Sequence, residues 1–204
     1  MCFSEYAPDD TDGLLSMWRG YGEDGTGAAV VFDSSKLIVT EGRTPFVLAK
    51  VEYGTTDKRL NWINQKILDI SIWLESQKVT QDILYRVAWY FFERIKFFAI
   101  FTKHDGFSEE QEWRYVYLKD RDKDNTYESM LSYFVSMSGI QPKLKLKMLD
   151  IKDNVPLDEL VSNIILGPAA SSTLQRKTVE RLLEQSGKGG LIEKLTSSTI
   201  PYRP

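Results

Sequence analysis

The residues best suited to chemistry in this sequence are two glutamates, Glu110 and Glu112, in the segment GFSEEQEWRYVYLKD at 106–120. The segment alternates like a β-strand, in which residues two apart face the same side at about 7 Å along the chain. Glu110, Glu112 and Arg114 would then share one face. Two aligned carboxylates raise each other's pKa, and a carboxylate can stabilise the positive charge that forms when a glycosidic bond breaks. Cleavage of the nicotinamide–ribose bond of NAD is a reaction of this kind.

The same pattern also has a purely structural interpretation. Arg114 is the next residue on the shared face and would neutralise Glu112 as an ion pair, while Glu109 and Glu110 would be solvated turn residues. The sequence leaves both interpretations open, because Glu-x-Glu occurs by chance in most charged proteins.

A second group of candidates precedes the glycine-rich turn GEDGTG at 22–27. Arg19 could contact a phosphate, and Tyr21 could stack on a nicotinamide or a base. In the alternative interpretation, Trp18 and Tyr21 pack a short helix onto a sheet. The glycines match neither the dinucleotide fingerprint nor the Walker spacing, so they indicate a turn.

The composition excludes several other kinds of site. Cys2 is the only cysteine and His104 the only histidine, which rules out an internal disulfide, a cysteine zinc cluster and a multi-histidine metal site. Glu5 and the acidic loop with Asp9, Asp10 and Asp12 could serve a metal-dependent nuclease, but solvation explains these carboxylates more simply, so we predict no metal. The net charge of −3 gives no strong signal of nucleic-acid binding.

The chain shows no targeting or membrane signal. The start, MCFSE, lacks the basic and apolar regions of a signal peptide. The most apolar stretch, 83–101, contains four charged residues, which argues against a membrane span. We therefore expect a soluble, cytoplasmic protein.

The hydrophobic patterns predict an α+β fold with a mostly antiparallel sheet, a central helical pair and a C-terminal helix before the last strand. The start of the chain is expected to be the end of a short strand, and further strands are expected at 28–33, 45–54, 110–118, 142–149, 163–168 and 191–204. Helices are expected at 12–18 (capped by Asp12), 60–74, 80–101, 127–137 and 173–185. We expect one domain over 1–204, in which 59–103 could be a helical insertion. The aromatic helix at 80–101 is expected in the core; any exposed part would mark a partner surface.

Several motifs in order resemble a known family. They are CFSE, MWRGYGEDGTGAAVVFD, EEQEWR, IILGP and STIPYR. Together they resemble the bacterial family called domain of unknown function twenty-nine seventy-one, from Cys2 to Arg203. The family is largely uncharacterised, so the resemblance names no reaction. Its members usually have an upstream portion with an NDPFE-like segment, which this sequence lacks; a short member, a fragment or a misassigned start would explain the difference.

The chain is also similar, more distantly, to ADP-ribosyltransferases of the Arg-Ser-Glu type. That similarity would give Ser4 the serine position, Glu112 the role of the ribose-binding carboxylate and Glu110 the acceptor side. The arginine on the first strand, which holds the cofactor phosphates in such enzymes, has no counterpart before Cys2. The separation of Ser4 and Glu112 also exceeds the usual one.

Two hypotheses about function follow. The first is an ADP-ribosyltransferase-like toxin or phage-defence effector with NAD as substrate, in which Ser4, Arg19 and Tyr21 contact the cofactor and Glu110 and Glu112 are catalytic. The second is a non-catalytic partner-binding or regulatory domain of a defence system. The sequence gives neither the acceptor nor the oligomeric state.

Overall fold

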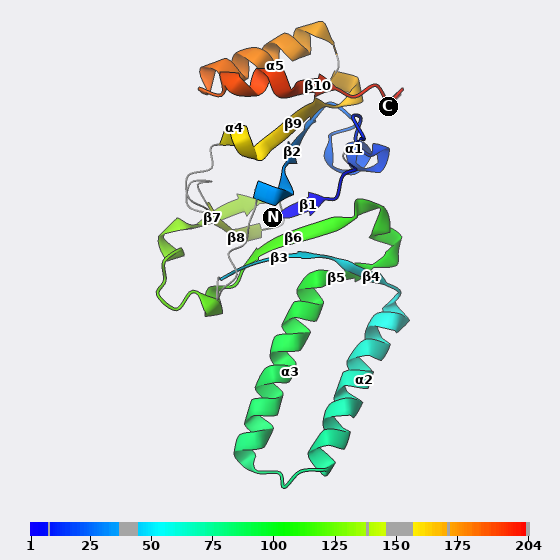
Figure 1. The fold of residues 1–204 in the computed structure, drawn as a ribbon, viewed down its shortest axis with the longest axis vertical. Coiled ribbons are helices and arrows are strands. Elements are labelled where there is room, and N and C mark those ends of the chain that lie inside the picture. The colour runs from blue at the N-terminus through cyan, green and yellow to red at the C-terminus, as the bar shows by residue number, and fades with distance from the viewer. Residues whose placement is uncertain (8, 37–44, 138, 146–156, 171, 203–204) are drawn as a thin grey trace. The chain divides into compact units, whose positions relative to one another are not determined.

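The computed structural model describes residues 1–7, 9–36, 45–137, 139–145, 157–170 and 172–202 (Figure 1). The fold is α+β, as predicted, and it contains antiparallel strand pairs. Among the described residues the strands form four small sheets, and two of these contain a parallel pair, β4–β5 and β9–β10. The chain forms two compact units, one of residues 1–5 and 48–115 and one of residues 6–47 and 116–204. The expected insertion at 59–103 lies within the first unit.

The first unit contains the helical pair and the strands around it. Its elements are β1 (Cys2–Ser4), β4 (Glu52–Gly54), α2 (Thr56–Glu75), α3 (Gln81–Phe101), β5 (Thr102–His104) and the 3-10 helix η2 (Asp105–Glu110), with most of β3 (Phe46–Lys50) and β6 (Glu112–Tyr117). β6 lies between β1 and β3, and β4 pairs with β5 in parallel. The strand expected at 45–54 is therefore two strands in two different sheets.

The helix α3 starts where the sequence predicts, whereas α2 starts four residues before the expected Leu60. The Thr55 hydroxyl accepts a hydrogen bond from the amide of Lys58 at 3.1 Å, and Thr80 caps α3 in the same way. Such N-caps satisfy amides that have no partner inside the helix. The helices lie side by side as a hairpin in which the rings of Trp62 and Phe98 stack 4.5 Å apart (Figure 1).

The prediction that the aromatic helix forms part of the core is wrong. Of all the residues of α2 and α3, only Phe101, at the end of α3, is buried. Tyr85, Trp89, Tyr90 and Phe92 are all exposed. A helix that is apolar almost all round is normally buried, but here the described chain supplies only α2 to cover it.

The second unit has the larger hydrophobic core. Its elements are α1 (Leu15–Tyr21), β2 (Ala28–Phe32), the hairpin β7 (Leu131–Ser136) and β8 (Gly139–Leu144), α4 (Leu157–Leu160), β9 (Val161–Leu166), α5 (Thr173–Gln185), β10 (Leu195–Ser197) and the 3-10 helices η1 (Ser34–Lys36), η3 (Lys119–Arg121), η4 (Glu128–Met130), η6 (Pro168–Ala170) and η7 (Gly189–Lys194). The central strand β9 pairs with β2 and β10. Its buried Val161, Ile164 and Leu166 pack with Leu191 and Leu195. The apolar run of β9 thus predicts its burial correctly.

Two predictions in this unit are wrong. The sequence pattern predicts a helix at 127–137, but these residues form a short 3-10 turn and then β7, which pairs with β8 from Leu131 to Ser136. Cross-strand pairing outweighs the mixed helical pattern here. Asp12 caps no helix, because α1 begins at Leu15 without a side-chain cap, and Asp12 instead accepts hydrogen bonds from Thr199.

The boundaries of two other predicted strands also differ. The strand expected from residue 142 begins at Gly139 and ends at Leu144, and residues 146–149 lie outside the described ones. The last strand is limited to Leu195–Ser197, preceded by a 3-10 helix. Within the described residues, no helix has the length and apolar character that crossing a membrane requires.

Candidate functional site

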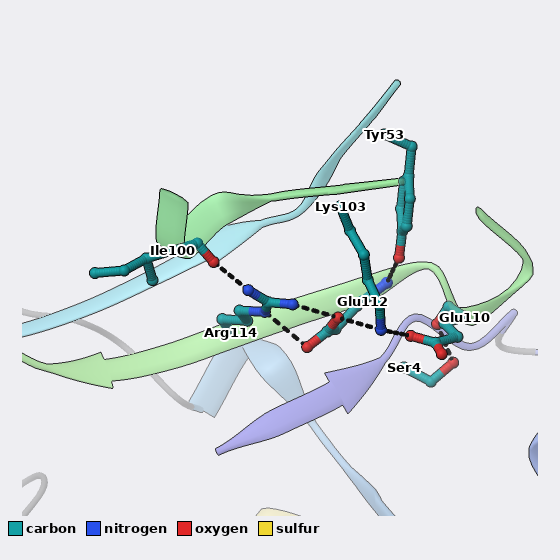
Figure 2. A network of polar contacts seen from close by, with 7 residues as sticks. All are labelled: Ser4, Tyr53, Ile100, Lys103, Glu110, Glu112 and Arg114. Atoms are coloured by element: carbon teal, nitrogen blue, oxygen red, sulfur yellow. Dashed lines mark hydrogen bonds and ion pairs between the residues drawn. The ribbon is translucent and has the colours of Figure 1, made fainter. Parts of the chain in front are cut away.

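Glu112 is the centre of a buried polar network in the first unit (Figure 2). It is the first residue of β6, and its side chain is only 7% exposed. The guanidinium of Arg114 donates two hydrogen bonds to its carboxylate, from Nε to Oε1 at 2.8 Å and from Nη2 to Oε2 at 3.0 Å. A bidentate pair of this kind is among the strongest polar contacts in proteins. Arg114 therefore neutralises Glu112, as the structural interpretation of the sequence expects.

Lys103 connects the two glutamates. It extends from β5, and its Nζ contacts Oε2 of Glu110 and, at 3.3 Å, Oε2 of Glu112 (Figure 2). The negative charges of the two carboxylates are thus balanced by the positive charges of Lys103 and Arg114 within one cluster. Lys103 is absent from the sequence-based candidates, because a three-residue strand directly after a helix leaves no pattern to detect.

The two glutamates come together differently from the expectation. Glu110 is not on the strand: it ends η2, and Gln111 follows it in the left-handed conformation at φ 42°. Strand alternation therefore cannot align Glu110 with Glu112. The shared contact with Lys103 brings their carboxylates together instead.

Ser4 lies at the same site through the pairing of β1 with β6. It is directly opposite Glu112 in the antiparallel register, and its hydroxyl donates to the backbone carbonyl of Glu110 at 2.7 Å (Figure 2). The structure thus brings together three of the five predicted site residues. The Ser4 hydroxyl already has a structural partner, the carbonyl that precedes the left-handed Gln111.

Further contacts hold Glu112 and Arg114 in place. The amide of Glu112 donates to the Tyr53 hydroxyl at 2.9 Å. The Nη1 of Arg114 donates to the carbonyl of Ile100, in the last turn of α3, where backbone carbonyls have no partner in the helix (Figure 2). One arginine thus satisfies a buried carboxylate and a helix end at once.

The electrostatics follow from these contacts. The hydrogen bonds from Arg114 lower the pKa of Glu112 to about 2, against the opposing effect of burial. Burial acts to lower the pKa of Lys103, but its hydrogen bonds to both glutamates outweigh this and raise it. Burial, followed by the neighbouring Glu112, raises the pKa of the Cys2 thiol. Glu112 is therefore firmly ionised and Cys2 remains a thiol at neutral pH.

Arg19 and Tyr21 belong to the second unit, on α1. Tyr21 is exposed, so it does not pack its helix onto a sheet, whereas Trp18 is buried and donates from its indole to the carbonyl of Asp12 at 2.9 Å. Arg19 is exposed and hydrogen-bonds with Tyr202. Trp18 is thus buried, as the structural interpretation of this segment predicts, whereas Tyr21 is not.

A comparison with protein families bears on the resemblance drawn from the motifs. Residues 17–115 match a family described as "Protein of unknown function (DUF2971)". This match supports the DUF2971 resemblance over a segment that includes α2, α3 and β6 up to Tyr115. No curated protein and no solved structure matches the chain.

Proposed function

We propose that this protein is a partner-binding domain whose contact surface is the α2–α3 hairpin. The carrying observation is the exposure of large apolar side chains on both helices: Leu60, Trp62, Ile67, Leu68, Ile72 and Trp73 on α2, and Leu84, Tyr85, Trp89, Tyr90 and Phe92 on α3. Monomeric proteins rarely expose apolar patches larger than a few hundred Å², and larger ones mark interaction sites.

The physical argument is that two helices alone cannot bury such surface. Most helix stability in proteins comes from packing an apolar face against a neighbour. Within α2 and α3 only Phe101 is buried, so the hairpin keeps most of its apolar surface in contact with water. A partner that covers it would remove this unfavourable hydration.

The polar network around Glu112 supports the same proposal. Its carboxylate is already occupied by Arg114 and Lys103. The arginine links β6 to the last turn of α3 through the Ile100 carbonyl. In this proposal the network fixes the base of the hairpin so that its surface is presented in one orientation.

An in-cell crosslinking experiment tests the proposal. A photo-crosslinking amino acid at position 92 should give covalent adducts in cells of the native host. The same amino acid at Leu174, an exposed apolar residue of α5, is the matched control. Adducts from both positions alike, or from neither, would contradict a binding surface on the hairpin.

A second candidate, an ADP-ribosyltransferase-like effector acting on NAD in defence or as a toxin, has one observation in its favour. Ser4, Glu110 and Glu112 lie together, as the serine and glutamate positions of the Arg-Ser-Glu similarity require, although the first-strand arginine of that similarity has no counterpart. The test is a thermal shift with NAD, with NAD turnover measured for the wild type and Glu112→Gln. A thermal shift and an NAD turnover that are both lost in Glu112→Gln would support this candidate. The same shift and turnover in the variant as in the wild type would contradict it.

A further inference from the structure

We infer that the partner of α3 is a second copy of this chain, which packs antiparallel against its outer face. The inference rests on the proposed function and identifies its partner. The contact surface is the outer stripe of α3, defined as Tyr85, Trp89 and Phe92. Their spacing of four and three residues places them on one helix face, and they are 79%, 59% and 70% exposed.

The outer stripe is distinct from the face of α3 that contacts α2. That inner face includes Phe98, stacked on Trp62, and Val87, Phe91 and Arg94, which line a groove between the helices together with Trp62 and Trp73 of α2. α3 therefore has two apolar faces with the spacing of helix–helix contacts. α2 occupies the inner face, and the described residues offer no second helix for the outer one.

The charges that flank the stripe have a self-complementary order. Counted from Trp89, Asp82 lies seven residues before and Lys96 seven after, while Arg86 lies three before and Glu93 four after. When two α3 helices cross antiparallel at Trp89, Asp82 of each copy faces Lys96 of the other, and Arg86 faces Glu93. A parallel arrangement would place like charges opposite each other, which is unfavourable.

The aromatic positions follow the same symmetry. Tyr85 lies four residues before Trp89 and Phe92 three after, so each Tyr85 meets Phe92 of the other copy in the antiparallel arrangement. An isologous contact requires this reciprocity. The surface beside Tyr85 is a shallow, open depression formed by side chains of α3 itself, among them Asp82, Arg86 and Trp89.

Charge and area both favour a second copy over a charged partner. The four flanking charges cancel, and each already has a partner of opposite sign in its own helix, Asp82 with Arg86 at 3.1 Å and Glu93 with Lys96 at 2.7 Å. Such a neutral surface does not favour nucleic acid. The three rings alone expose roughly 400 Å², about half of what each partner contributes to a stable interface, and the stems of the charged side chains add to it.

The test uses charge reversal in the full-length chain. Sedimentation velocity over a concentration series should show a reversible dimer for the wild type. Arg86→Glu places like charges opposite Glu93 twice in each dimer and should weaken the dimer at least about tenfold. The double variant Arg86→Glu/Glu93→Arg should recover the wild-type affinity to within about threefold.

The double variant separates contacts between copies from contacts inside one helix. It places a glutamate at position 86 beside Asp82 and an arginine at position 93 beside Lys96, so both internal pairs become repulsive and only a contact between copies can restore the dimer. Arg176→Glu, which disrupts a partly exposed ion pair of the same i, i+4 type on α5, is the control and should leave the dimer unchanged. Circular dichroism checks that each variant is folded, and Trp89→Gln, which keeps all charges, should also yield monomers.

The possible results distinguish this inference from the proposed function. A monomeric wild type, or equal loss of the dimer in the single and double charge variants, overturns the second copy as partner. Crosslinks from position 92 report on the proposed function independently of sedimentation. Adducts at twice the mass of the chain support both ideas, adducts only at other masses support the proposed function alone, and the absence of adducts contradicts both.

Discussion

The guanidinium of Arg114 holds the buried carboxylate of Glu112 through two hydrogen bonds of 2.8 and 3.0 Å and also caps the last turn of α3. The two residues are next to each other on one face of β6. This pairing links a local feature of the sequence to the placement of the helical hairpin.

Arg114→Ala should be strongly destabilising. It leaves the Glu112 carboxylate buried without its main partner, and breaking a buried pair from one side costs about 3–5 kcal/mol. Denaturant unfolding measures the change. Arg176→Ala is the matched control, because it breaks the more exposed pair with Glu180 on α5 and should cost no more than about 1 kcal/mol. Equal losses in the free energy of unfolding would show that the buried pair with Glu112 stabilises the protein no more than the pair on α5 does.

The stability of the protein should fall in acid because of Glu112. Its pKa is about 2 in the folded chain and 4.5 as the ordinary value. The unfolded state therefore binds more protons between these values, so the stabilisation is complete above pH 4.5 and is lost as the pH falls towards 2. The difference sets an upper bound of about 3 kcal/mol. Unfolding measured from about pH 2 to 7 should show this slope, and Glu112→Gln should reduce it; an unchanged slope would contradict the assignment.

Much of this site could be predicted from the sequence, for a physical reason. The two-residue period of a strand places Arg114 beside Glu112, and no tertiary information is needed to see that pair. Lys103 and Tyr53 could not be predicted, because they reach the site through the parallel pairing of two three-residue strands far apart in the sequence. The strand pattern places Glu110 wrongly, since a left-handed residue such as Gln111 leaves little trace in a sequence.

In the fold, too, some features could be predicted from local sequence patterns and others depend on tertiary contacts. The helical pair follows from its period, and β9 follows from its apolar run. The exposure of α3 does not, because burial depends on what packs against a helix, and its composition alone indicates a core position. The strand β7 could not be predicted from its own residues, whose mixed pattern suggests a helix. Its conformation depends on pairing with β8, which the pattern of β7 alone does not reveal.

Asp122→Ala should lower the thermal midpoint. The buried Asp122 carboxylate accepts from the Tyr117 hydroxyl at 2.7 Å and from the amides of Thr126 and Tyr127 at 2.9 and 3.0 Å. Its removal leaves three donors without this acceptor, in a turn where the backbone depends on it. Asp124→Ala, the same change at an exposed position two residues further on, should leave the midpoint unchanged. The prediction fails if both variants melt alike.

Gly167→Ala should be among the most damaging single substitutions in the second unit. A Cβ at Gly167 would lie 2.3 Å from the carbonyl oxygen of Gly25, and this neighbour is backbone that cannot rotate away. The close approach is fixed by hydrogen bonds from Gly167 to the Gly27 carbonyl at 2.9 Å and from Ala169 to the Gly25 carbonyl at 3.0 Å. The added methyl group would force the two segments apart, which should lower the free energy of unfolding by about 3 kcal/mol or more.

The matched control is Gly189→Ala, because nothing lies within 4 Å of the added methyl group at that position. It should change the free energy of unfolding by no more than about 0.5 kcal/mol. Denaturant unfolding of the two variants provides the comparison. If Gly167→Ala is as stable as Gly189→Ala, the glycine-rich turn and the end of β9 do not approach each other as closely as the hydrogen bonds between them indicate.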